Sequence, residues 1–130
     1  MLRKKILIID DESPISDLVV ELLESEGYSD VERASNGLEG LEKYKSFLPD
    51  LVIMDMQMPV MDGYESSCKI KSFDPEARIL VLTGNPGDNK AHQTVREGYA
   101  LSLLQKPIRL TDLSRSIREN LPLQRENIQA

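Results

Sequence analysis

Acidic side chains follow the first apolar run of the chain. The stretch "ILIIDDES" at residues 6–13 places Asp10 and Asp11 directly behind four aliphatic residues, with Glu12 next to them. Adjacent carboxylates repel each other, and charge at the end of a buried strand is unfavourable unless something neutralises it. Carboxylate oxygens suit a hard divalent cation such as Mg²⁺. We therefore predict that Asp10 and Asp11 form two sides of a magnesium site, and we interpret Glu12 as a helix cap.

Further polar side chains follow the later apolar runs. Asp55 comes after "LVIM", Thr83 after "RILVL", and Lys106 shortly after "LSLL". A carboxylate can act as a nucleophile and form an aspartyl-phosphate. A hydroxyl and an ammonium group beside it can hold the phosphoryl oxygens. These residue types therefore predict phosphoryl transfer to Asp55, with Thr83 and Lys106 at the phosphoryl group.

These side chains meet only if the apolar runs form neighbouring parallel strands. The runs are short and aliphatic, which favours strands at residues 5–9, 31–34, 51–54, 78–82 and 101–104. Three of them are apolar nearly throughout, as expected of strands covered on both faces. Ligands of open parallel sheets bind outside the carboxyl ends of the strands. The chemistry is therefore expected at that edge.

Helical patterns lie between the apolar runs. Ser13-Pro14 is interpreted as an N-cap and first helical position, and the apolar stripe behind it consists of Ile15, Leu18, Val19, Leu22 and Leu23. Further helices are expected from Asn36 to Leu48, and at residues 61–72, 88–97 and 111–121. Strict alternation of strands and helices predicts an α/β domain with a parallel sheet covered on both faces.

The domain is expected to occupy residues 1–121, with 122–130 as a tail or the start of a linker. Asp62-Gly63 is interpreted as a tight turn into the third helix, because glycine permits a close approach of backbones. His92 is interpreted as a surface residue of the fourth helix and not as the phosphorylated group.

Composition and charge restrict the function classes. The 130 residues carry a net charge of −6, which argues against direct binding of nucleic acid or anionic membranes, since both depend on Lys/Arg clusters. A single cysteine, Cys68, excludes an intramolecular disulfide and a cysteine-only metal site, and it is interpreted as a small buried helix residue. No apolar run is long enough to span a bilayer, and no signal-peptide pattern is present, so a cytoplasmic protein is expected.

Jointly, these residues resemble the receiver domain of two-component response regulators. The matching motifs are "IIDDE" at the first strand, "DMQMPVMDG" from Asp55, Thr83-Gly84 and Lys106-Pro107, and the resemblance covers about residues 4–121. It implies a flavodoxin-like, doubly wound five-stranded sheet with strand order 2-1-3-4-5 and five helices. It also implies a partner that donates the phosphoryl group, either a sensor histidine kinase or a phosphotransfer protein, and a downstream output protein or domain.

The resemblance further implies roles for single residues. Asp55 corresponds to the phospho-acceptor. Mg²⁺ would be bound directly by Asp11, Asp55 and the backbone carbonyl of Gln57, and largely through water by Asp10. The chain would promote its own phosphorylation and dephosphorylation, and would not be a turnover enzyme on an external substrate.

The remaining family positions lie near the fourth and fifth strands. Thr83 and Lys106 correspond to residues that contact the phosphoryl group, and the Lys106-Pro107 peptide bond is often cis in the family. Leu103 stands where members commonly carry a Tyr or Phe that turns inward on activation, and the segment from Gly98 to Lys106 is about one residue longer than usual. We therefore expect a switch without a ring rotation, in which Leu103 stays largely buried and residues 88–97 move.

Two other functions compete with this reading. Haloacid-dehalogenase-like phosphatases also form an aspartyl-phosphate, but they carry a second acid two residues after the nucleophile, where this chain has Gln57, and 130 residues leave no room for a cap domain. A receiver-like interaction module that takes no phosphate would be expected to lack Asp11, Asp55, Thr83 or Lys106, and all four are present. A phosphorylation assay would separate this alternative from a receiver.

Overall fold

A parallel sheet forms the centre of the protein, whose computed structural model describes residues 4–85 and 87–121. Within these residues the strands are β1 (Lys5–Ile9), β2 (Asp30–Ala34), β3 (Leu51–Asp55), β4 (Ile79–Thr83) and β5 (Ser102–Gln105). Their order in the sheet is β2-β1-β3-β4-β5, and every neighbouring pair is parallel. This confirms the predicted flavodoxin-like strand order.

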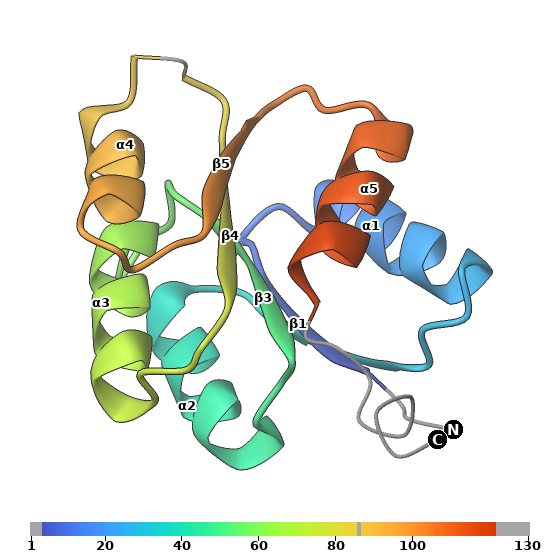
Figure 1. Cartoon of the computed structure of the whole chain (residues 1–130), viewed down its shortest axis with the longest axis horizontal. Helices are drawn as coiled ribbons and strands as arrows, with labels where there is room; N and C mark the ends of the chain where they lie inside the picture. The colour runs from blue at the N-terminus through green and yellow to red at the C-terminus, as the bar shows by residue number, and fades with distance from the viewer. Residues whose placement is uncertain (1–3, 86, 122–130) are drawn as a thin grey trace.

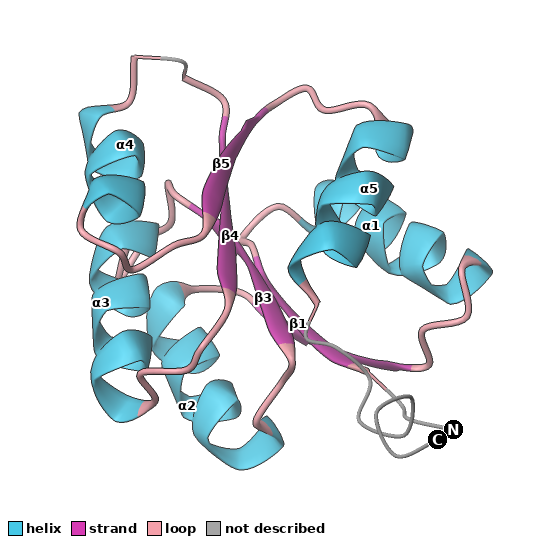
Figure 2. Ribbon diagram, in the orientation of Figure 1, coloured by secondary structure: helices cyan, strands magenta, loops and turns pink. Residues whose placement is uncertain are grey.

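Helices cover both faces of this sheet. They are α1 (Ser13–Ser25), α2 (Gly37–Phe47), α3 (Gly63–Phe73), α4 (Asn89–Arg96) and α5 (Leu110–Asn120). Figure 1 shows α2, α3 and α4 on one face and α1 and α5 on the other, and Figure 2 shows that a helix follows each strand through loops at the sheet edges. No helix of the described part of the chain is long and apolar enough to cross a membrane.

The central strands β1 and β3 are apolar on both faces because helices cover both. Their side chains alternate between two cores. Leu7, Ile9, Val52 and Met54 belong to the core beneath α2, α3 and α4. Ile6, Ile8, Leu51 and Ile53 belong to the core beneath α1 and α5. This alternation fixes the register of β1 against β3, since a slip of one residue would exchange the two sets.

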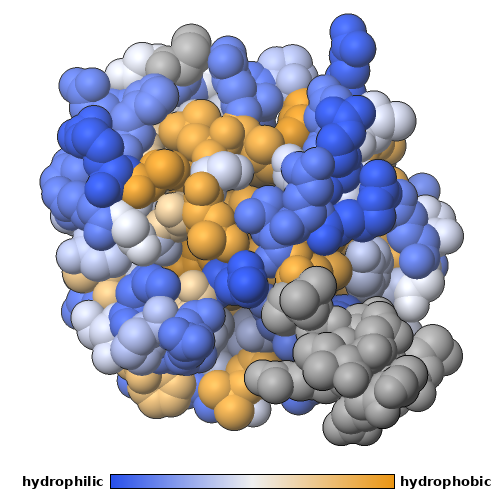
Figure 3. Space-filling model, in the orientation of Figure 1, coloured by the Kyte–Doolittle hydropathy of each residue, from blue (hydrophilic) through white to orange (hydrophobic). Residues whose placement is uncertain are grey.

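The edge strand β5 is covered less completely. Ser102, Leu103 and Leu104 are half-buried and Gln105 is exposed. Figure 3 shows hydrophobic surface gathered over this strand, between α4 and α5. Leu103 packs against the core beneath α2, α3 and α4 but is only half-buried, less than the largely buried position that was expected for it.

Side-chain caps begin three of the helices. The carboxamide of Asn36 accepts a hydrogen bond from the Glu39 backbone N–H at 2.9 Å and so caps α2. Asp62 and Asp88 cap α3 and α4 in the same way. Such a bond satisfies one of the backbone donors that a helix leaves without a partner at its first turn.

Three details differ from the sequence predictions. Helix α1 already includes Ser13, so the expected N-cap at Ser13 is wrong by one residue and Glu12 takes that position without a side-chain cap bond. Leu18, expected on the buried stripe of α1, is 55% exposed. Cys68 is half-buried in α3 rather than buried. The expected tail at residues 122–130 lies outside the described residues.

Candidate functional site

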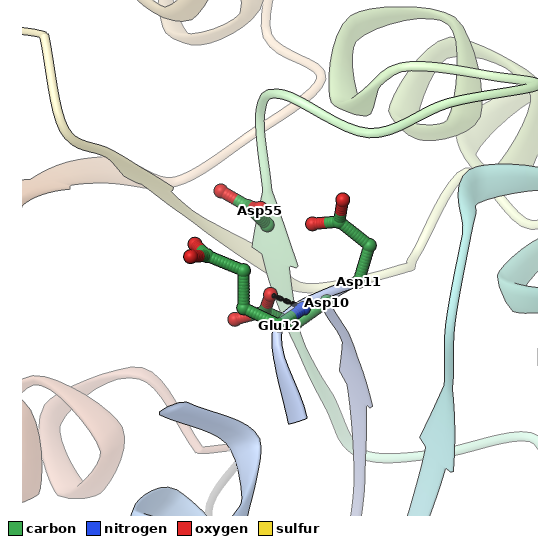
Figure 4. Close-up of side chains that lie close together, drawn as sticks. All are labelled: Asp10, Asp11, Glu12 and Asp55. Atoms are coloured by element: carbon green, nitrogen blue, oxygen red, sulfur yellow. Dashed lines mark hydrogen bonds between the residues drawn. The ribbon is translucent and has the colours of Figure 1, made fainter. Parts of the chain in front are cut away.

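Four carboxylates meet at the carboxyl ends of β1 and β3. Because Ile9 pairs with Met54 across these strands, the residues that follow each of them come out at the same edge of the sheet. Each of the four side chains, Asp10, Asp11, Glu12 and Asp55, has a carboxylate oxygen that lies within 4.8 Å of the oxygens of the other three. Figure 4 shows Asp55 extending from β3 toward the segment that carries the other three acids. The structure thus places the three predicted aspartates together and adds Glu12.

Burial divides these carboxylates into two pairs. Asp10 and Asp55 are buried, at 6% and 4% exposure, whereas Asp11 and Glu12 are exposed. The pKa of Asp55 is raised from its ordinary value of 3.8 to about 6, chiefly by burial and also by the charges of Asp10 and Asp11, against the lowering effect of Lys106. Burial also raises the pKa of Asp10, although its carboxylate accepts a hydrogen bond from the Glu12 backbone N–H at 2.8 Å.

Lys106 provides the positive charge at this cluster. Its Nζ donates to Asp55 Oδ1 at 3.1 Å and lies 3.6 Å from Glu12 Oε1 and 4.0 Å from Asp10 Oδ2. Partial burial alone would lower the pKa of Lys106, but the carboxylates of Asp55, Asp10 and Glu12 raise it overall. The backbone fixes the start of this side chain, since the Lys106 N–H donates to the Thr83 carbonyl at 2.7 Å. The Lys106-Pro107 peptide bond is cis.

A cavity of about 340 Å³ opens over the cluster. Its walls are formed by Asp11, Glu12, Asp55, Gln57, Gly84 and Lys106. Gln57, predicted to contribute its backbone carbonyl, is therefore at the site. Glycine at position 63 allows the β3–α3 loop to close beneath it, because a Cβ there would lie 2.5 Å from the Asp55 carbonyl oxygen and 2.8 Å from Met56 Cα.

A second, larger cavity of about 440 Å³ adjoins the first and shares Gly84 and Lys106 with it. Its lining is mainly apolar and comes from α1, from the end of β4, from the segment that joins β5 to α5 and from α5 itself. The apolar lining residues are Ile15, Leu18, Val19, Leu82, Pro107, Ile108, Leu110 and Leu113. This cavity explains why Leu18 is exposed on the helix face that was expected to be buried.

Thr83 lies at the predicted place, the end of β4, but its hydroxyl is engaged elsewhere. Its nearest acceptor is Asp88 Oδ2 at 3.0 Å, the Asn85 backbone carbonyl is a second acceptor at 3.3 Å, and it accepts from the Asn85 backbone N–H at 3.1 Å. Thr83 is buried and is not among the residues that line the acidic cavity. In this structure the hydroxyl is therefore held on the side of α4.

The sequence predictions missed the contributions of two acids. Glu12 was interpreted as a helix cap and does stand at the N-cap position of α1, but without a side-chain cap bond. Its side chain lies instead beside Lys106, and the run "DDE" before Ser13-Pro14 was the available signal. Asp88 was placed only as the start of a helix, and its bond to Thr83 depends on a loop conformation that the sequence pattern does not show. His92 is exposed on α4, as predicted.

The donor set at the cluster fits a hard divalent cation. All four acidic side chains offer oxygen, and two of them are buried where their mutual repulsion is weakly screened. The pKa of Asp55 is raised first by burial and then by repulsion from Asp10 and Asp11, and a cation at this place would relieve the repulsion. The residues present therefore fit Mg²⁺ better than a metal that prefers nitrogen or sulfur ligands.

Comparisons with known proteins agree with this geometry. The response regulator receiver domain family matches residues 6–118. The chain is 38% identical over 109 residues to the chemotaxis protein CheY of Halobacterium salinarum, covering 82% of this chain and 90% of that protein. It is 35% identical over 123 residues to the sporulation initiation phosphotransferase F of Bacillus subtilis, covering 95% and 98%.

Solved structures show the same similarity. A CheY-like response regulator receiver domain protein from Methanospirillum hungatei JF-1 has a TM-score of 0.84 at 32% identity, covering 91% of this chain and 93% of that one. The response regulator protein TrrA from Thermotoga maritima, in complex with Mg²⁺ and beryllium fluoride, has a TM-score of 0.79 at 32% identity, covering 91% and 99%.

Proposed function

The chain belongs to the response regulator receiver domain family, and from this we propose that it accepts a phosphoryl group on Asp55 in a Mg²⁺-dependent reaction. Receiver domains are signalling domains and not turnover enzymes on external substrates. We take residues 1–121 as the receiver unit. The proposed donor is a phosphohistidine of a sensor kinase or phosphotransfer protein, and the product state switches a surface for a downstream protein or domain.

The observation that carries this proposal is the position of Asp55. Its carboxylate lies among three other acids and 3.1 Å from Lys106. With a pKa of about 6 it is mostly ionised at neutral pH, as a nucleophile must be. In the proposed transfer, an Asp55 oxygen forms a bond to phosphorus while the phosphorus–nitrogen bond of the donor breaks and its electron pair leaves with the imidazole.

Asp11, Asp55 and the Gln57 carbonyl are the proposed direct ligands of Mg²⁺, with Asp10 acting largely through water. When bound, the metal would neutralise the negative charge that gathers on the phosphoryl oxygens. Lys106 is already placed to pair with the new anion, since it touches the acceptor carboxylate in this structure. Thr83 would donate its hydroxyl hydrogen to a phosphoryl oxygen once it is released from Asp88.

The surroundings of the acidic cavity suit a protein donor. The apolar cavity adjoins it through Gly84 and Lys106, and two leucines at its rim, Leu18 and Leu110, are 55% and 46% exposed. A donor protein that buries these leucines would bring a phosphohistidine to the mouth of the acidic cavity. The negative net charge of the chain supports a protein partner and not nucleic acid.

Acetyl phosphate tests the proposal without the unknown donor. Incubation of the protein with acetyl phosphate and Mg²⁺ should add the mass of one phosphoryl group, and chelation of Mg²⁺ should prevent it. Asp55→Asn should abolish the addition. Asp50→Asn is the matched control, because Asp50 lies just before the opposite end of β3 and contacts the Lys5 backbone. Undiminished labelling of Asp55→Asn would refute the assignment, and no labelling of the wild type would favour the phosphate-independent interaction module.

A further inference from the structure

The hydroxyl of Thr83 and the carboxylate of Asp88 form a direct hydrogen bond at the end of β4. We propose that Asp88 is a positioning residue that holds the Thr83 hydroxyl away from the acidic cavity and thereby opposes the phosphorylated state. This inference rests on the proposed function, because it concerns the contact between Thr83 and a phosphoryl group on Asp55. It adds that Asp88 controls how readily Thr83 makes this contact.

Both carboxylate oxygens of Asp88 have partners. Oδ2 accepts from the Thr83 hydroxyl at 3.0 Å, and Oδ1 accepts from the Ala91 backbone N–H at 3.1 Å, which caps α4. The backbone of the loop supports this arrangement, since Asn85 donates its N–H to Thr83 Oγ1 at 3.1 Å and accepts from the Asp88 N–H at 3.0 Å. The bond to the Ala91 N–H therefore holds the Asp88 carboxylate in place, and this carboxylate in turn holds the Thr83 hydroxyl.

The Thr83 hydroxyl carries a single hydrogen, so its two uses exclude each other. It can donate that hydrogen within the loop, where Asp88 Oδ2 at 3.0 Å is a nearer acceptor than the Asn85 carbonyl at 3.3 Å, or it can donate it to a phosphoryl oxygen on Asp55. Formation of the second bond requires loss of the first, and Asp88 would then keep its cap but lose a buried donor. The bond to Asp88 thus stabilises only the unphosphorylated arrangement, which is the differential interaction that a population shift requires.

Helix α4 is suited to respond to the loss of this bond. Of its eight residues, only Ala91 and Thr94 are buried. Its first turn is also held by an ion pair of Lys90 with Asp62, at 3.1 Å, and Asp62 itself caps α3. The attachment of α4 thus depends on polar contacts at its N-terminus more than on apolar packing. Breaking the Thr83–Asp88 bond should therefore lower the local stability of α4 more than it would lower that of a well-buried helix.

Two substitutions at position 88 separate the cap from the bond to Thr83. Asp88→Asn keeps an oxygen for the Ala91 N–H, but its NH₂ group cannot accept the hydroxyl hydrogen. Asp88→Gly removes the side chain and leaves a residue that is also tolerated at an N-cap. Asp62→Asn is the matched control, since it also removes one negative charge from a helix cap and weakens a polar contact of α4, the ion pair with Lys90, but has no bond to Thr83.

The measurement is a titration of each protein with beryllofluoride and Mg²⁺, followed by amide NMR, with the Ala91 amide reporting whether α4 is intact. A hydrogen bond of this kind contributes about 0.5–1.5 kcal/mol net, so both position-88 variants should bind beryllofluoride about two- to tenfold more tightly than the wild type. Asp62→Asn should bind with nearly wild-type affinity.

The possible outcomes are distinct. Wild-type affinity or weaker binding in both position-88 variants, with α4 intact, would show that Asp88 does not oppose the phosphorylated state, while the proposed function would stand. Equal tightening in Asp62→Asn would show that loss of charge or of a polar contact at α4, and not the Thr83 bond, is responsible, and would also overturn the inference. If the wild type binds no beryllofluoride and takes no phosphoryl group, the proposed function fails and the inference fails with it.

Discussion

The carboxyl edge of the sheet is built in two different ways. At β1 and β3, the acids follow strands whose residues from Ile6 to Ile9 and from Leu51 to Met54 are all buried. At β4 and β5, the site depends on side-chain hydrogen bonds, a short helix and a half-covered edge strand. We call these the β1–β3 half and the β4–β5 half of the site.

The difference corresponds to what each half is proposed to do. A nucleophile and metal ligands need fixed positions, which packed strands provide. A hydroxyl that changes partner, and a helix that responds to the change, need interactions that can be exchanged at small cost. Asp55 is thus held by buried packing and Thr83 by a polar contact, and substitutions in the two halves should have different effects on stability.

The largest effect is expected from the acceptor itself, in the metal-free protein. Burial raises the pKa of Asp55 to about 6 from 3.8, so the folded state holds a proton more tightly than the unfolded state. The free energy of unfolding should therefore fall as the pH rises from about 4 to above 6. The loss amounts to about 3 kcal/mol at neutral pH. Asp55→Asn should recover most of it at pH 7 and little at pH 4.

Urea unfolding in a chelator at several pH values measures this difference. Asp11→Asn is the control, because Asp11 is exposed and its neutralisation should change the stability far less. An Asp55→Asn protein that gains no stability, or gains the same amount at pH 4 and pH 7, would show that the β1–β3 half is not strained by its buried charge.

A second prediction compares one glycine from each half. Gly63→Ala would place a Cβ 2.5 Å from the Asp55 carbonyl oxygen, where only movement of backbone can make room, and should lower the stability by about 2 kcal/mol. Gly84→Ala on the other side of the cavity would meet no heavy atom within 4 Å, and should leave stability unchanged or raise it by about 0.5 kcal/mol. Thermal unfolding of both variants measures the two changes in stability. Equal losses of stability would contradict the proposed difference between the two halves of the site.

Most of the fold followed from the sequence because its signals were redundant. The run "LVIM" and its neighbours are apolar on both faces, and helical stripes separate them, so a parallel sheet was the consistent solution. The strand order came from the resemblance and not from periodicity. Boundaries were less certain, as at Ser13, because the residues around Pro14 permit an N-cap at either Glu12 or Ser13.

The candidate site was predictable where it depends on strand ends. Asp10, Asp11 and Asp55 meet because each directly follows or ends a central strand, which is a property of topology. The hydrogen-bond partner of Thr83 was not predictable, because Asp88 reaches it through a loop whose conformation no periodic pattern encodes. Leu103 is only partly buried because β5 lies at the edge of the sheet, and whether it moves on phosphorylation stays a prediction.

The smallest effect concerns Val60, in the loop between β3 and α3. Val60 has a φ of 70°, a conformation that is unfavourable for a β-branched residue by about 1–2 kcal/mol. Its neighbours impose it, since the Met61 N–H donates to the Pro59 carbonyl at 2.7 Å and the Met61 carbonyl accepts from the Gly37 N–H. The β1–β3 half is therefore well packed but strained at one exposed residue.

Val60→Gly should relieve this strain. The side chain is 76% exposed, so little packing is lost with it. The greater freedom of glycine in the unfolded chain offsets part of the gain, and the net stabilisation should be about 1 kcal/mol by urea unfolding. Val60→Ala keeps the Cβ that is unfavourable at positive φ and should gain clearly less. If both variants are destabilised, the contacts of the Val60 side chain contribute more to stability than the backbone strain costs. The β1–β3 half would then carry no net strain at this residue.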